Sequence, residues 1–132
     1  MTVRSDLDDI VFGIRDMYEA FLTADRQRFD QHLAPGTTTW ETHFPRMYSR
    51  AELDAYRDAR TSAERPVLDD IRVDVVRSTV WDDVAVVGYV LTTYAPDGGT
   101  TTSRVTDVLE RIDGEWRIVH HHAEARDDRE QP

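Results

Sequence analysis

The sequence predicts an α+β fold in which helices come first and a long antiparallel meander follows. Apolar residues recur at helical spacing from residue 7 to residue 22, a pattern typical of an amphipathic helix. From Val67 the apolar pattern changes to a period of two residues and keeps it to about residue 124. No linker and no repeat interrupts the 132 residues, which indicates one domain over residues 1–124 and a polar tail over residues 125–132.

The first 35 residues are expected to form two helices. Ser5, with Asp8 three residues later, resembles a capping box, so we expect the first helix to begin there and to run for about five turns. Asp25 is the expected N-cap of a short second helix that extends to Leu33. Pro35, followed by glycine, ends this second helix.

A strand and a third helix are expected before the meander. Residues 37–43 are β-branched and aromatic, which favours a strand. Ser49 and Glu52 have the spacing of a second capping box, so a third helix is expected to begin there and to end near Thr61. Pro66 marks the boundary between this helix and the strands.

Four long strands are expected in the second half of the chain, separated by short polar turns. A sheet of such strands can curl around the first helix and bury its apolar stripe, and space for a ligand can remain between helix and sheet. The expected strands are at roughly residues 67–78, 81–95, 101–112 and 115–124.

The net charge and the hydropathy exclude two classes of partner. The chain has 26 acidic and 16 basic residues and a formal charge of −10, which argues against binding to a nucleic-acid backbone. No apolar run approaches the ~20 residues of a membrane span, and the N-terminus lacks the pattern of a signal peptide. We therefore expect no nucleic-acid or membrane partner and a cytoplasmic protein.

The residue types that are absent restrict the chemistry. The chain has no cysteine, hence no disulfide and no thiolate nucleophile or ligand. It has no lysine, which excludes Schiff-base chemistry and a P-loop lysine. Its five serines lie in no G-x-S-x-G context, so nucleophilic hydrolysis is not expected. Histidine, aspartate, glutamate, tyrosine and arginine remain as candidates.

Asp107 is the most informative residue of the expected strands. It lies in mid-strand between Val105 and Leu109, which share its face at a period of two residues. A carboxyl group on an apolar strand face is costly to bury unless it is paired, hydrogen-bonded or protonated. A purely structural alternative is an ion pair of Asp107 with Arg104 or Arg111 at the open end of the sheet.

The turn at Asp113 decides which histidine Asp107 meets. A two-residue turn would place Asp107 opposite His120, whereas a three-residue turn with a glycine bulge would place it opposite Val119 and on the face of His121. In either register a histidine shares a face with Asp107. A carboxylate beside an imidazole orients the ring and favours its protonated form, as an acid–base pair requires.

His120 and His122 lie two residues apart on one strand face, which is half of a possible metal site. No further ligands follow at a recognisable spacing, so we expect no metal and no cofactor. On an outer sheet face, the two histidines would instead lie in a dimer interface. A third hypothesis, a metal-dependent enzyme that uses the clustered histidines, stays open.

Two segments carry a resemblance to a known family. Residues 33–41 resemble the P-G-x-T-x-aromatic-E segment that enters the first strand of the association domain of calcium/calmodulin-dependent protein kinase. Residues 106–122, with D-G-x-W and V-H-x-H, resemble the closing hairpin of that domain. Both segments are similar to the nuclear transport factor 2-like superfamily, which includes SnoaL-like polyketide cyclases, ketosteroid isomerase and scytalone dehydratase.

The resemblance implies a cystatin-like α+β barrel: a cone-shaped, curved antiparallel sheet wrapped around a long N-terminal helix. It also implies a pocket inside the cone and homodimers formed through the outer sheet face. The pocket positions that hold arginines in the kinase domain correspond here to Leu91, Asp107 and Ala123, none of which is basic. The same comparison favours the bulged register, in which Asp107 and His121 face inward.

The resemblance leads to a functional hypothesis with one main alternative. The chain would bind a small apolar carbonyl compound and isomerise, cyclise or dehydrate it without a cofactor, as an isomerase or a lyase. Asp107 would transfer the proton, and His121 or a tyrosine would assist. The alternative is a non-catalytic ligand-binding or oligomerisation module. Glu41 and His43 are weaker candidates, because they alternate away from Trp40 along the strand. The residues that we expect to line the pocket are Trp40, Tyr56, Tyr89, Leu91 and Ala123.

Overall fold

The first helix, α1, presents its apolar stripe to the sheet. The structure is a computed structural model that describes residues 5–126, and α1 spans Asp6–Leu22. The side chain of its N-cap Ser5 accepts a hydrogen bond from the backbone N–H of Asp8 at 3.1 Å, which satisfies one donor that a helix start leaves free. The predicted helix start is therefore confirmed. The buried side chains of α1 are Ile10, Ile14, Met17, Tyr18 and Ala20.

Two shorter helices and a 3-10 turn follow. Helix α2 spans Arg26–Asp30, α3 spans Arg50–Ala59, and the 3-10 turn η1 spans Ser62–Glu64. At the start of α3 the side chain of Ser49 accepts from the backbone N–H of Glu52, and the side chain of Glu52 accepts from the backbone N–H of Ser49. This is the capping box that the spacing predicts.

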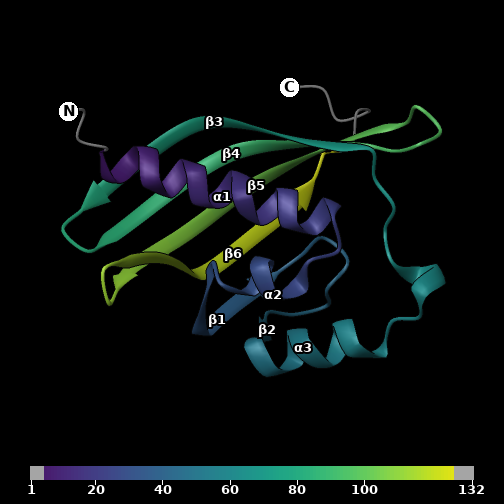
Figure 1. The fold of residues 1–132 in the computed structure, drawn as a ribbon, viewed down its shortest axis with the longest axis horizontal. Coiled ribbons are helices and arrows are strands. Elements are labelled where there is room, and N and C mark those ends of the chain that lie inside the picture. Colours follow the sequence, from purple (N-terminus) through teal and green to yellow (C-terminus); the bar gives the residue numbers. More distant parts are fainter. Residues whose placement is uncertain (1–4, 127–132) are drawn as a thin grey trace.

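One six-stranded sheet, in the order β2-β1-β6-β5-β4-β3, forms the body of the molecule. Helix α1 lies across this sheet, and α2 and α3 lie on the side of β1 and β2 (Figure 1). All neighbouring strands are antiparallel except β1 and β6, which are parallel. The sheet is curved and open, and the predicted α+β class is confirmed. The strands are β1 (Leu33–Trp40), β2 (Tyr48–Ser49), β3 (Asp70–Trp81), β4 (Val84–Tyr94), β5 (Thr100–Ile112) and β6 (Glu115–Ala125).

The hydrophobic core lies between α1 and the concave face of the sheet. Its strand residues alternate with exposed ones, as expected for a half-buried antiparallel sheet. The buried strand residues that pack against α1 are Val73, Ala85, Val87, Tyr89, Val105, Leu109, Ile118 and Ala123. Within residues 5–126, no helix combines the length and the hydropathy that crossing a membrane requires.

The segment around Pro35 differs from the prediction. Helix α2 ends at Asp30, and β1 begins at Leu33, so the proline and the following glycine lie inside a strand. The pairing of β1 with β6 shifts between Leu33 and Thr38, which leaves this stretch out of the regular ladder. Proline lacks a backbone donor and is tolerated at such irregular points of a strand.

The β5–β6 hairpin has a two-residue turn, so the predicted three-residue bulged turn is wrong. Ile112 pairs with Glu115, and both turn residues have positive φ (Asp113 52°, Gly114 82°), the combination that a type I′ turn requires. Continued without interruption, this register would place His120 opposite Asp107. A bulge changes the register further along the hairpin.

The bulge leaves Val119 without a partner on β5. Leu109 pairs with Ile118, but the preceding residue, Val108, pairs with His120. The extra residue moves the rest of β6 by one position, and His121 therefore pairs with Asp107. The inward-facing histidine is the predicted one, for a different structural reason.

Candidate functional site

A cavity of about 690 Å³ lies between α1, the concave face of the sheet and α3. Its volume is within the range of small-molecule sites. The exposed surface of its lining is largely apolar, and the charged side chains in it are described below. The apolar lining includes Met17, Phe21, Phe29, Leu33, Leu53, Leu68, Ile71, Leu91 and Ala123.

A buried pair of charged side chains lies in the wall of this cavity. The side chain of Asp107 is 0% exposed, and its Oδ1 is 2.6 Å from Nδ1 of His121. The imidazole is 13% exposed and lines the cavity, whereas Asp107 is not among the lining residues. The predicted pairing is therefore present, with the carboxylate enclosed behind the ring.

Glu41 completes a line of three charged groups. It follows β1 directly, and its Oε1 is 3.1 Å from Nε2 of His121. The imidazole is thus held between two carboxylates, one on each ring nitrogen. Glu41 lines the cavity, and its other oxygen, Oε2, has no hydrogen-bond partner among residues 5–126.

These contacts determine the protonation of the site. Burial lowers the pKa of His121, but the charge of Asp107, its hydrogen bond and the hydrogen bond and charge of Glu41 outweigh burial and raise the pKa to about 10. For Glu41, burial raises the pKa, but the hydrogen bond and charge of His121 lower it below the ordinary value. At neutral pH the site therefore contains an imidazolium and an ionised Glu41.

Two tyrosines extend the hydrogen-bond chain behind Asp107. The hydroxyl of Tyr89 donates to Oδ2 of Asp107 at 2.7 Å and lies 2.7 Å from the hydroxyl of Tyr18. Because the single proton of Tyr89 is used toward Asp107, Tyr18 must donate to Tyr89. The oxygen lone pairs of Tyr18, which lines the cavity, remain available as acceptors.

The predicted lining residues fall into three groups. Tyr56, Leu91 and Ala123 line the cavity. Tyr89 is 2% exposed and lies behind Tyr18, outside the lining set. Trp40 lies instead on the outer sheet face, where its ring stacks on His122 at 5.8 Å between centroids.

The position of Trp40 has a simple physical reason. Successive strand residues point to opposite faces, so the residues before and after Trp40 face inward when it faces outward. Thr37, Thr39 and Glu41 accordingly line the cavity. The sequence analysis assigned the opposite face to this strand and therefore ranked Glu41 as a weaker candidate.

Tyr18 is a cavity residue that could not be recognised from the sequence. Tyr18 belongs to the apolar stripe of α1, which a sequence pattern cannot distinguish from core. The contact of Tyr18 with Tyr89, which in turn bonds Asp107, can be recognised only when the helix is placed on the sheet. His43, a weaker candidate, lines the cavity and bonds to the hydroxyl of Tyr56 at 3.1 Å.

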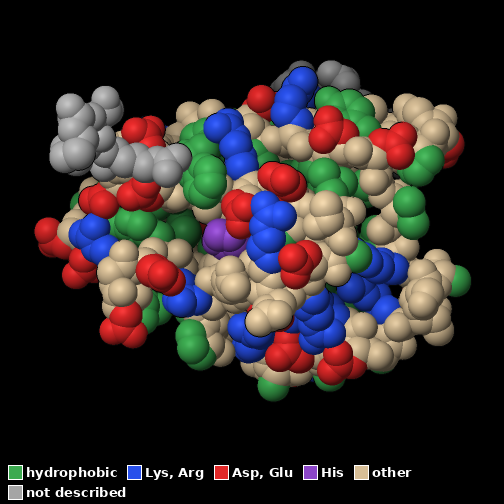
Figure 2. Space-filling view, in the orientation of Figure 1, with side chains coloured by type: hydrophobic (Ala, Val, Ile, Leu, Met, Phe, Trp, Pro, Cys, Tyr) green, Lys and Arg blue, Asp and Glu red, His purple; other side chains and the backbone are tan. Residues whose placement is uncertain are grey.

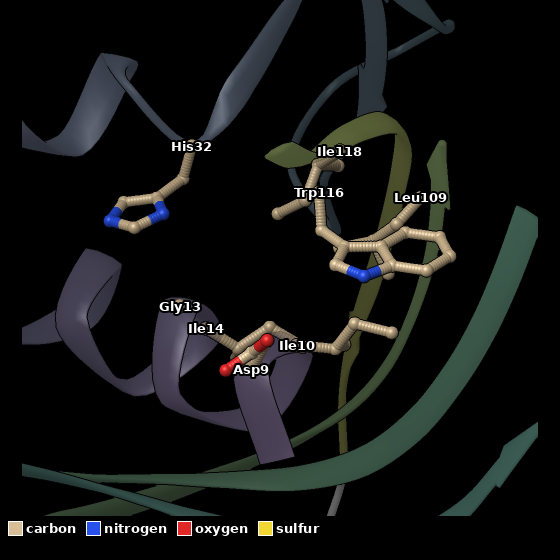
Figure 3. A pocket seen from close by; sticks show the side chains of 8 residues that line it. All are labelled: Asp9, Ile10, Gly13, Ile14, His32, Leu109, Trp116 and Ile118. Atoms are coloured by element: carbon tan, nitrogen blue, oxygen red, sulfur yellow. The ribbon is translucent and has the colours of Figure 1, made fainter. Parts of the chain in front are cut away.

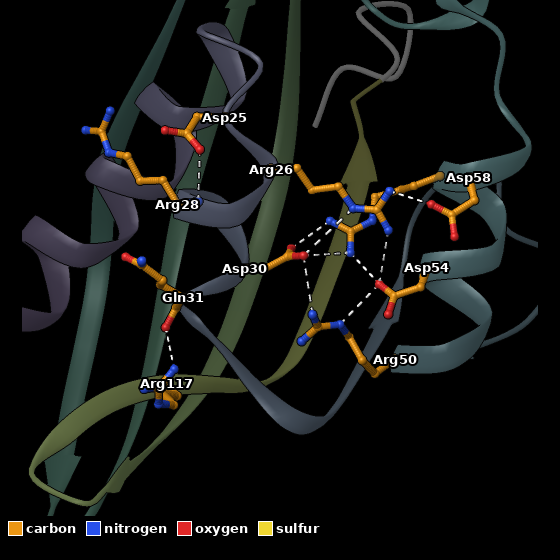
Figure 4. Close-up of polar contacts among 10 residues, drawn as sticks. Asp25, Arg26, Arg28, Asp30, Gln31, Arg50, Asp54, Asp58 and Arg117 are labelled. Atoms are coloured by element: carbon orange, nitrogen blue, oxygen red, sulfur yellow. Dashed lines mark hydrogen bonds and ion pairs between the residues drawn. The ribbon is translucent and has the colours of Figure 1, made fainter.

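A network of ion pairs attaches α3 to α2 beside the cavity (Figure 4). Asp30 accepts from Nη1 of Arg57 at 2.7 Å and lies 3.3 Å from Arg50. Asp54 lies 3.2 Å from Arg50 and also pairs with Arg57. Shared carboxylates and guanidinium groups hold these side chains in fixed positions, and several linked pairs stabilise more than isolated surface pairs do.

A second cavity, between α1 and the β5–β6 hairpin, has a volume of only about 10 Å³. His32, Trp116 and Ile118 surround it (Figure 3). This volume is about that of one water molecule, too small for an organic ligand. His32 is held by Asp16, whose carboxylate is 2.8 Å from Nε2 of the ring, and has a structural role.

The two outer histidines, His120 and His122, each contact a residue of β1. Nδ1 of His120 is 2.7 Å from the hydroxyl of Thr38, and His122 stacks on Trp40. Among the described residues no three histidine, aspartate or glutamate side chains converge in a way that could hold a metal ion. Both histidines lie on the sheet face opposite α1, because His121 between them faces inward.

Comparison with known proteins identifies the family. Residues 13–124 match the model of the SnoaL-like domain, and the chain belongs to this family. None of the curated proteins compared with the chain matches it in sequence.

Solved structures share the fold at low sequence identity. A candidate ketosteroid isomerase from Parabacteroides distasonis has a TM-score of 0.78 and 17% identity, over 96% of this chain and 92% of that chain. The CamKII hub homology domain of Chlamydamonas reinhardtii has a TM-score of 0.73 and 19% identity, over 93% and 100% of the two chains. An uncharacterized protein with a cystatin-like fold from Caulobacter vibrioides has a TM-score of 0.66 and 18% identity, over 93% and 91%. The predicted nuclear transport factor 2-like fold is confirmed.

The pKa of His121 predicts how stability depends on pH. The folded-state pKa of about 10 exceeds the ordinary 6.5, so between these values the folded state holds one proton more than the unfolded state. The stabilisation is complete below pH 6.5 and is lost as pH rises toward 10. The free energy of unfolding should decrease by about 1.4 kcal/mol per pH unit in this range.

Urea unfolding followed by tryptophan fluorescence at pH 6 to 9 measures this slope. The matched variant His121→Gln removes the titrating group and should flatten the slope, whatever its absolute stability. Equal slopes in the two proteins would contradict the assignment of the raised pKa to His121.

Proposed function

We propose that this SnoaL-like protein is a cofactor-free acid–base catalyst that acts on an apolar carbonyl compound bound in the cavity. The observation that supports it is the ionised carboxylate of Glu41 at an apolar cavity wall, with one oxygen fixed by the imidazolium of His121. A carboxylate that is ionised at neutral pH and held in place by a hydrogen bond can accept a proton from carbon.

In this proposal Glu41 is the catalytic base. Its free oxygen, Oε2, removes a proton from the carbon next to the substrate carbonyl, and the electron pair moves onto the carbonyl oxygen. The protonated carboxyl group then returns the same proton to another carbon of the ligand. The proton balance closes without an external oxidant, reductant or cofactor. Cyclisation or dehydration can begin with the same proton removal.

His121 and Asp107 position this base. His121 donates to Glu41 through Nε2 and to Asp107 through Nδ1, so the ring cannot rotate without losing both bonds. Asp107 is enclosed and both its oxygens accept hydrogen bonds, one from His121 and one from Tyr89. Asp107, which was expected from the sequence to transfer the proton, acts instead through His121, as a positioning residue.

Glu41→Gln should slow proton transfer by at least about 100-fold, because the amide keeps the shape of the side chain but cannot accept the proton. Deuterium exchange at the α-carbons of a panel of apolar ketones, followed by NMR in D2O, measures the transfer without knowledge of the natural substrate. Glu124→Gln on the exposed side of β6 is the matched control and should keep the wild-type rate. A Glu41→Gln protein as active as the control would refute the assignment.

Asp107→Asn tests the positioning role through His121. Removal of the charge should lower the pKa of His121 by about 1–3 units, measured by NMR titration of the imidazole. The alkaline limb of the activity profile should move to lower pH with it, since Glu41 loses its fixed partner when His121 deprotonates. A lower rate with an unchanged alkaline limb would indicate a merely structural role, and circular dichroism checks that the variant is folded.

A second candidate function, assembly into homodimers through the outer sheet face, is favoured by exposed apolar side chains there. Trp40 and Trp81 are 40% and 56% exposed, and Val84 is 39% exposed. Half-buried Val108 lies among them, on the same outer face. Exposed apolar side chains gathered on one face are typical of interaction sites.

Val108→Glu would place a charge in the middle of this face, and we expect it to convert a dimer into a monomer while the fold is retained. Sedimentation velocity measures the change. The control Val67→Glu introduces the same charge at a 71% exposed position outside the strands and should leave the dimer intact. A monomeric wild-type protein at micromolar concentration would exclude this function.

A further inference from the structure

Arginine side chains line the end of the cavity next to α3, on a chain whose formal charge is −10. Four contribute, and the surface view shows basic side chains gathered in the lower half of the molecule, on the side of α2 and α3 (Figure 2). Asp25 and Glu64 are the carboxylates at this end of the lining. The four arginines are Arg26, Arg57, Arg60 and Arg65.

Arg57 has one donor that the protein does not use. Its Nη1 and Nη2 donate to Asp30, and Nη2 also contacts Asp54, so the guanidinium is held in place. Its Nε is buried and has no hydrogen-bond partner among the described residues. A buried donor without an acceptor is unfavourable, and an oxygen of a bound ligand would satisfy it.

Arg60 leaves more of its guanidinium unused. Its Nε is also buried and unpartnered, and within residues 5–126 no carboxylate forms an ion pair with it. The group lies over the ring of Tyr56, 5.5 Å from the centroid, which fixes its plane beside the cavity. Glu64, an acidic residue of the lining, uses its Oε1 to accept from the backbone and hydroxyl of Thr61, and these hydrogen bonds together with the charge of Arg60 lower its pKa.

The two ends of the cavity therefore differ in charge. At the sheet end, the ionised Glu41 repels a ligand anion, Tyr18 offers an acceptor, and the buried hydroxyl of Thr37, which has no hydrogen-bond partner among the described residues, can donate or accept. At the α3 end, Arg57 and Arg60 offer positively charged donors. A ligand with an anionic group has one favourable orientation, with the anion toward α3.

We infer that the ligand is an apolar carboxylic acid whose carboxylate binds Arg60 and Arg57 at the α3 end of the cavity. The Nε and one Nη of a guanidinium form a planar fork that matches the two oxygens of a carboxylate. The apolar lining between the two ends accommodates the carbon chain. This inference rests on the proposed function in one respect: it directs the reacting carbon of the ligand toward Glu41.

Binding of three compounds with eight carbon atoms each tests the inference. Octanoate, 1-octanol and octyl phosphate differ in the head group and by at most one carbon in the alkyl chain, and isothermal titration calorimetry on the full chain gives the affinity of each at low ionic strength. We expect octanoate to bind at least about tenfold more tightly than 1-octanol, as a charge-assisted hydrogen bond adds to the shared burial of the chain. Octanoate should also bind more tightly than octyl phosphate.

Arg60→Gln locates the site. This variant should lower the affinity for octanoate toward that for 1-octanol, with the remaining difference due to Arg57, and it should leave 1-octanol binding unchanged. Arg60 forms no ion pair among the described residues, so its substitution leaves the α2–α3 network intact. The matched control Arg72→Gln, on β3 with a side chain that is 62% exposed, should bind octanoate like the wild type.

Three results would overturn the inference: no measurable binding of octanoate, equal affinity for octanoate and 1-octanol, or unchanged octanoate binding in Arg60→Gln. Tighter binding of octyl phosphate would overturn the choice of a carboxylate. These outcomes are independent of catalysis. If Arg60→Gln binds octanoate more weakly but the wild-type protein exchanges no ketone proton, the proposed function alone is refuted. If the wild-type protein exchanges protons in a way that depends on Glu41 but shows no preference for octanoate, this inference alone is refuted.

Discussion

The buried contact between Asp107 and His121 is the constraint on which the site depends. An enclosed carboxylate is tolerated only when charged or polar partners surround it, and here an imidazolium and a tyrosine hydroxyl supply them. The contact raises the pKa of His121, and the protonated ring in turn keeps Glu41 ionised at the cavity wall. One buried charge thus determines the charge state of the surface that a ligand would meet.

The cavity combines two kinds of polar group that different parts of the fold supply. Glu41, next to the end of β1, and Tyr18 of α1 place acceptors at one end, and α3, attached to α2 through shared ion pairs, places arginines at the other. Apolar residues of α1 and the sheet separate the two ends. Helix α3 lies against β1 and β2, which brings its arginines to the cavity.

Local signals in the sequence predicted the elements well, and contacts between distant segments explain the differences. The capping signals at Ser5 and Ser49 and the change of apolar period after Pro66 each depend only on neighbouring residues. They were sufficient to predict two of the helices and the antiparallel strands. The facing of β1 depends on its parallel pairing with β6, some 80 residues away in the sequence, for which no local pattern exists. Glu41 was therefore underrated, and the arginines of α3 could be recognised only once the helix was placed beside the cavity.

The unpaired Val119 determines which of the three consecutive histidines lies opposite Asp107. A single extra residue in β6 selects which imidazole enters the interior, and the neighbours on either side carry the same side chain. A slip of the strand by one position in either direction would still deliver an imidazole to the enclosed carboxylate. An insertion or deletion of one residue in this hairpin would therefore still leave the enclosed carboxylate opposite an imidazole.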